Sequence, residues 1–76
     1  MARNKEVDAL LMMGTWMNQV AKNDIEMGLA THTARMAIEQ AMHFIATNTE
    51  SNDLQAQLAI DSLRKTHTKI EEKLDE

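Results

Sequence analysis

The sequence predicts a small all-α protein, a bundle of three antiparallel helices. Its 76 residues include no proline and two glycines, so little interrupts helix formation. Apolar residues recur at helical spacing along most of the chain. A chain of this length has room for one domain, residues 1–76, and without cysteine no disulfide can stabilise it. Tight helix packing or association with a second copy must therefore supplement a thin core.

Two similar segments indicate where helices begin. The segments 23–26 (NDIE) and 52–55 (NDLQ) both resemble capping boxes, in which an Asn side chain accepts a hydrogen bond from the backbone three residues later. They predict helices over about 4–22, 24–46 and 53–74, with 47–51 as the clearest loop. Gly28 leaves an alternative open, because glycine costs about 1 kcal/mol inside a helix. In that alternative, 23–30 is an irregular connection and Thr31 or Thr33 caps the second helix.

The first predicted helix has an apolar arc that covers more than half of its circumference, from Ala9 to Ala21. Met13 and Met17 lie on this arc and are expected in the core. A single neighbouring helix cannot bury so wide an arc. The helix either lies between the other two or completes a core across a dimer interface. Trp16, at the edge of the arc, is expected to anchor a partner or to cover the core. Met12 lies on the otherwise polar side and is a candidate contact residue.

The second predicted helix has two unequal faces. Its core face is expected to consist of Met27, Ala30, Ala34, Ala37, Ile38, Ala41, Phe44 and Ile45. The opposite stripe consists of Ile25, Leu29, His32, Met36, Glu39 and His43. Leu29 and Met36 are not explained by a simple core, so we expect this stripe to contact a partner unless the helix is central.

The third predicted helix carries a narrow apolar seam with alternating spacings of three and four residues. The seam consists of Ile60, Leu63, His67, Ile70 and Leu74. Leu54 and Leu58 continue the apolar side toward the loop. About two heptads cannot sustain an independent coiled coil, so the seam must pack on the other helices or on its copy in another chain. His67 on this seam could make assembly sensitive to pH. The more ordinary interpretation is a partly exposed histidine without a switching role.

The charge and hydropathy of the chain argue against two classes of partner. A net charge of -4 opposes binding to nucleic acid or to an anionic membrane. No apolar run approaches the ~18 residues of a membrane span. The apolar stretch 9–17 faintly resembles a secretory signal, but Glu6 and Asp8 cancel the positive charge that such a signal needs. A cytoplasmic location is expected.

No pattern in the sequence indicates catalysis. The familiar nucleophile, phosphate-binding and metalloprotease motifs are missing, so we expect no enzyme, cofactor or small-molecule substrate. Glu39 and His43 have a spacing at which both could touch one metal ion. His32, however, would lie about 16 Å along the axis from His43, so a surface stripe is the favoured interpretation.

These observations predict a non-enzymatic protein-interaction module that self-associates, as a homodimer, through the first helix and the seam of the third. The candidate interface residues are Met12, Trp16, Leu29, His32, Met36, His43, Leu63, His67 and Ile70. One alternative is a monomeric inhibitor or secretion-type co-chaperone that binds one protein. Another is a helix-turn-helix DNA-binding regulator, although no helix carries a row of Arg and Lys for phosphates.

Overall fold

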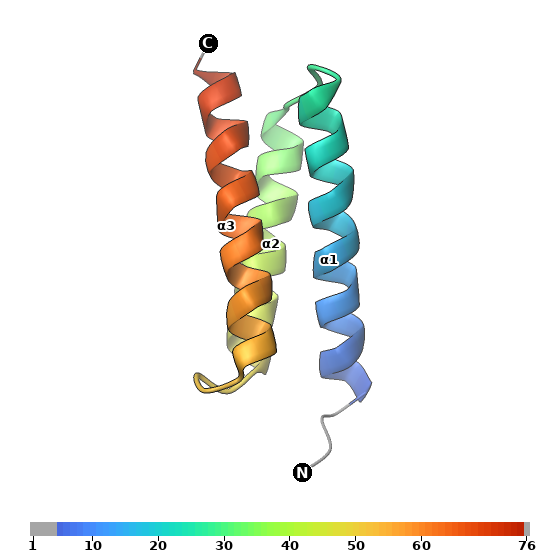
Figure 1. The fold of residues 1–76 in the computed structure, drawn as a ribbon, viewed down its shortest axis with the longest axis vertical. Helices are drawn as coiled ribbons and strands as arrows, with labels where there is room; N and C mark the ends of the chain where they lie inside the picture. Colours follow the sequence, from blue (N-terminus) through green and yellow to red (C-terminus); the bar gives the residue numbers. More distant parts are fainter. Residues whose placement is uncertain (1–4, 76) are drawn as a thin grey trace.

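The computed structural model describes residues 5–75, which form three helices and no strand: α1 (Lys5–Glu26), α2 (His32–Asn48) and α3 (Leu54–Leu74). The helix α2 runs opposite to α1 and α3, so α1 and α3 are parallel to each other (Figure 1). Each helix packs against both of the others. The predicted three-helix bundle is confirmed. The predicted start of the first helix at residue 4 lies outside the described residues.

The helix α1 continues through the predicted cap at Asn23 and ends at Glu26, so the first predicted boundary is wrong. Gly28 stops the helix instead, with φ at +77°. The Gly28 N–H donates to the Ile25 carbonyl at 3.0 Å, and the Leu29 N–H donates to the Asp24 carbonyl at 2.7 Å. These two bonds form a Schellman motif, which needs a left-handed residue at the position of Gly28. The glycine therefore outweighs the capping tendency of Asn23.

The helix α2 begins later than the main prediction and follows the alternative. Thr31 is its N-cap, and the Thr31 hydroxyl accepts a hydrogen bond from the Ala34 N–H at 3.0 Å. The irregular connection is shorter than expected, spanning 27–31. At its other end α2 continues to Asn48, where the Asn48 side chain donates to the Phe44 carbonyl at 2.8 Å. That bond satisfies a carbonyl that the end of the helix leaves free.

The cap of α3 lies one residue beyond the predicted Asn52. Asp53 is the N-cap, and its carboxylate accepts a hydrogen bond from the Ala56 N–H at 3.2 Å. A carboxylate at this position also interacts favourably with the positive end of the helix dipole, an advantage that asparagine does not have. The second predicted boundary was therefore close, but assigned to the wrong residue of the Asn-Asp pair.

The large side chains of the core come from α2 and α3. Ile38 and Ile45 on α2 pack with Leu63 and Ile70 on α3, and all are almost fully buried. The buried residues of α1 are all small, namely Gly14, Asn18 and Ala21. A Cβ atom on Gly14 would lie 2.9 Å from the Ile45 Cδ1 atom. Glycine at this position thus lets the backbone of α1 lie directly against the core.

Three residues that the sequence placed in the core are on the surface. Met13 on α1 and Phe44 on α2 are exposed, and Met27 is exposed in the turn after α1. Met13 faces outward because α1 packs through its small residues. Met27 is outside α2 because α2 begins at His32. Met17, also expected in the core, is partly buried against it.

One buried polar pair joins α1 to α3. The Thr66 side chain is fully buried, and its hydroxyl donates to the Asn18 side-chain oxygen. The same hydroxyl lies 3.1 Å from the Ser62 carbonyl, an alternative acceptor on its own helix. A buried polar group costs free energy unless it is paired, so sliding α1 along α3 would leave the Asn18 oxygen without a donor. The pair therefore favours one register between the two parallel helices.

Substitution of Gly28 tests the end of α1. No atom lies within 4 Å of a Cβ built at Gly28, so a substitution there changes only the backbone preference. We expect Gly28→Ala to lower the free energy of unfolding by about 1 kcal/mol, since non-glycine residues resist positive φ. Gly28→Asn should cost less, because asparagine tolerates this conformation. Equal urea midpoints for wild type and Gly28→Ala would contradict the assignment.

Substitution of Thr66 tests the buried pair. Thr66→Val keeps the shape of the side chain and removes the donor, so we expect a loss of about 1–3 kcal/mol of stability in urea unfolding. The double variant Thr66→Val with Asn18→Leu removes both polar partners and should recover most of that loss. The single variant Asn18→Leu completes the comparison. If the stability losses of Thr66→Val and Asn18→Leu simply add in the double variant, the two side chains are not coupled.

Candidate protein interface

The outward face of α1, defined as Ala9, Met12, Met13, Trp16 and Val20, is exposed and apolar. No charged residue occurs from residue 9 to residue 21. Trp16 is 69% exposed. It lies about 160° around the helix from the buried Asn18, because successive helical residues are about 100° apart. Met12, Met13, Trp16 and Val20 thus face away from the core, whereas Leu11 and Met17 are partly buried against it.

Hollows border Trp16 on both sides of α1. A groove of about 750 Å³ lies between α1 and α3, where Met12, Trp16 and the exposed Leu58 line it. A smaller hollow of about 190 Å³ lies between α1 and α2, lined in part by Trp16, Val20 and Ala37. The apolar surface therefore extends from α1 onto both neighbouring helices.

The seam of α3 is used inside the chain. Leu63 and Ile70 are buried against α1 and α2, and Ile60 and Leu74 pack against the same core. Leu63 and Ile70 were candidate interface residues, but neither exposes surface that a partner could contact. Their narrow seam was correctly identified as apolar, and its neighbours are the other two helices of the same chain.

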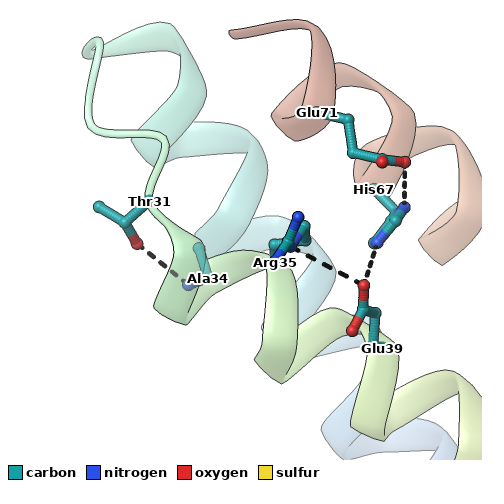
Figure 2. A network of polar contacts seen from close by, with 6 residues as sticks. All are labelled: Thr31, Ala34, Arg35, Glu39, His67 and Glu71. Atoms are coloured by element: carbon teal, nitrogen blue, oxygen red, sulfur yellow. Dashed lines mark hydrogen bonds and ion pairs between the residues drawn. The ribbon is translucent and has the colours of Figure 1, made fainter. Parts of the chain in front are cut away.

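His67 joins α3 to α2 through carboxylates. Its Nε2 atom lies 2.7 Å from Glu39 Oε1 on α2, and its Nδ1 atom lies 2.9 Å from Glu71 Oε1 on α3 (Figure 2). A carboxylate only accepts hydrogen bonds, so the ring donates to both when both nitrogens carry protons. Arg35 extends the network, with its Nε atom 3.9 Å from Glu39 Oε1. The network is an electrostatic link between helices.

The residues of the stripe predicted on the second helix do not all lie on that helix. Leu29 lies in the connection before α2, whereas His32, Met36 and His43 are on α2, and all four are exposed. The helical spacing that placed Leu29 on this stripe therefore does not apply. Within residues 5–75 no group of histidine and acidic side chains is arranged to hold a metal ion. In the same range, no helix has the length and apolar character to cross a membrane.

Four residues of the exposed apolar surface were not predicted from the sequence. Met13 was assigned to the core, while Ala9, Val20 and Leu58 were treated as parts of packed faces. The available signal was the absence of charge from 9 to 21, since a helix that shows this face to water usually carries charges there.

In comparisons with protein-family models, with curated proteins and with solved structures, no match to this chain was found. The assignment of a functional surface therefore depends on the chain's own geometry. Among the described residues, the strongest feature is the outward face of α1 together with the hollows beside Trp16.

Proposed function

We propose that the protein is a non-enzymatic interaction module that self-associates through the outward face of α1. The proposal depends on the orientation of α1, which buries only small residues and leaves Met12, Met13, Trp16 and Val20 exposed. Scattered exposed apolar residues are normal on a soluble protein, but a contiguous apolar patch is typical of an interaction site. Tryptophan at the middle of such a patch is a frequent energetic centre of interfaces.

The accessible surface of the chain supports a partner of substantial size. The chain exposes 5573 Å², and it is elongated, with extents of 45 × 17 × 16 Å. A compact monomer of 8.6 kDa is expected to expose about 4,700 Å², and the elongated shape accounts for part of the difference of about 900 Å². A standard protein interface buries about 800 Å² on each partner. Pairing with a second copy along the length of α1 would cover a comparable area.

The proposed surface differs from the one expected from the sequence. The prediction used both the first helix and the seam of the third helix, but Leu63 and Ile70 on that seam are buried. The proposal therefore retains α1 as the centre of the contact and omits the seam of α3. The exposed Leu58 on α3 extends the patch across the groove.

A matched pair of methionine substitutions tests this proposal. Met13 on α1 and Met36 on α2 are 58% and 53% exposed, so lysine should fit at either position without disturbing the core. We expect sedimentation equilibrium at micromolar concentration to give a dimer for the wild type and for Met36→Lys. Met13→Lys should give a monomer, because it would bury a charge without a partner in the apolar contact.

The control is the helical circular dichroism of each variant, which should match that of the wild type. A wild-type mass of 8.6 kDa at these concentrations would reject self-association. Dissociation by Met36→Lys but not by Met13→Lys would move the contact to the outer face of α2, the surface of the alternative prediction.

A further inference from the structure

We infer that two copies pair through antiparallel α1 helices, with Ala9, Met13, Trp16 and Val20 forming the seam between them. This inference rests on the proposed function and specifies the partner and its orientation. All four residues are exposed and uncharged. Their spacings are four, three and four residues, which is the alternation that places side chains along one side of two packed helices.

The order of the spacings suits a two-fold axis perpendicular to the helices. In such a dimer, if one residue contacts a second, the second also contacts the first. The series 4, 3, 4 is the same in both directions, so an antiparallel pair places Ala9 opposite Val20 and Met13 opposite Trp16. Every seam residue then has a seam residue of the second copy as its partner.

The sizes of the side chains favour the antiparallel arrangement over the parallel one. In the antiparallel pair, each layer of the contact consists of two residues that lie opposite each other, one from each copy. The small Ala9 and the larger Val20 fill one layer, and in the next the flexible Met13 can adapt to the ring of Trp16. A parallel pair would place each residue against itself. The Trp16 layer would then be overfilled and the Ala9 layer would contain a void, and both defects are destabilising.

Charges at the ends of α1 do not select this arrangement. A two-fold axis perpendicular to the helices brings equal flanks together, so Lys5 of one copy lies toward Glu26 of the second. On the other flank it brings Glu6 of one copy toward Asp24 of the second, two like charges. The antiparallel orientation is therefore inferred from the spacing and the sizes of the seam residues.

The neighbouring helix leaves space for the second copy. The seam lies on the side of α1 that borders α2, and the hollow there is lined by Trp16, Val20, Ala34 and Ala37. The alanines Ala34 and Ala37 are small and partly exposed, so α1 of a second copy can approach without a clash. The exposed Phe44 on α2 can then pack at the edge of the same contact.

Disulfide trapping between single-cysteine variants tests the orientation. The chain has no cysteine, so Ala9→Cys and Val20→Cys each introduce one defined thiol. In the antiparallel dimer each substituted position lies about 16 Å from its own copy, because 9 and 20 are eleven residues apart. A disulfide needs Cα atoms within about 7 Å, so neither variant can link to itself.

We expect oxidised glutathione to link the two variants only when they are mixed, giving a heterodimer that intact mass spectrometry identifies. Linkage of each variant to itself would overturn the antiparallel arrangement in favour of a parallel one. A dimer in sedimentation equilibrium with no linkage in any combination would overturn the seam while leaving self-association in place. A monomer in sedimentation equilibrium would overturn both the seam and the proposed function.

Discussion

The close contact between α1 and the core at Gly14 is the constraint on which the rest of the structure depends. The Ile45 Cδ1 atom of α2 lies 2.9 Å from the position that a Cβ of residue 14 would take, and the Leu63 Cδ1 atom of α3 lies 3.6 Å from it. The contact brings the backbone of α1 against a core built by the other two helices. Asn18 and Ala21 continue the same small face, and Asn18 also pairs with the buried Thr66. The rotation of α1 about its axis follows from these contacts.

That rotation determines which surface is available for function. With Gly14, Asn18 and Ala21 turned inward, Met12, Met13, Trp16 and Val20 must face outward. A chain of this size depends on apolar burial for its stability, so large apolar residues left on one exposed helix face are costly unless something covers them. The His67 network has the opposite character, because its imidazole and two carboxylate groups contact one another within the chain. We therefore place the function at α1 and treat the network as a structural link.

The fold was predictable from sequence to a greater extent than the candidate site. The narrow seam of the third helix allowed one orientation, so the burial of Leu63 and Ile70 follows from spacing alone once the other helices are present. The wide apolar arc of the first helix allowed several orientations, and spacing could not select among them. The choice depended on a single tertiary contact, between Gly14 and Ile45, which local sequence does not encode. Gly28 was recognised as a possible boundary, yet its effect depended on a Schellman motif that competed with a plausible cap at Asn23.

We propose that a second copy covers the outward face of α1, and the fluorescence of Trp16 tests this contact most directly. Trp16 is the only tryptophan of the chain, so its fluorescence reports this surface alone. We predict that the emission maximum shifts to shorter wavelength as the protein concentration rises through the dissociation constant, because the ring moves from water into an apolar contact. Emission typical of water-exposed tryptophan at every concentration, up to that at which the protein is fully associated by sedimentation, would contradict it.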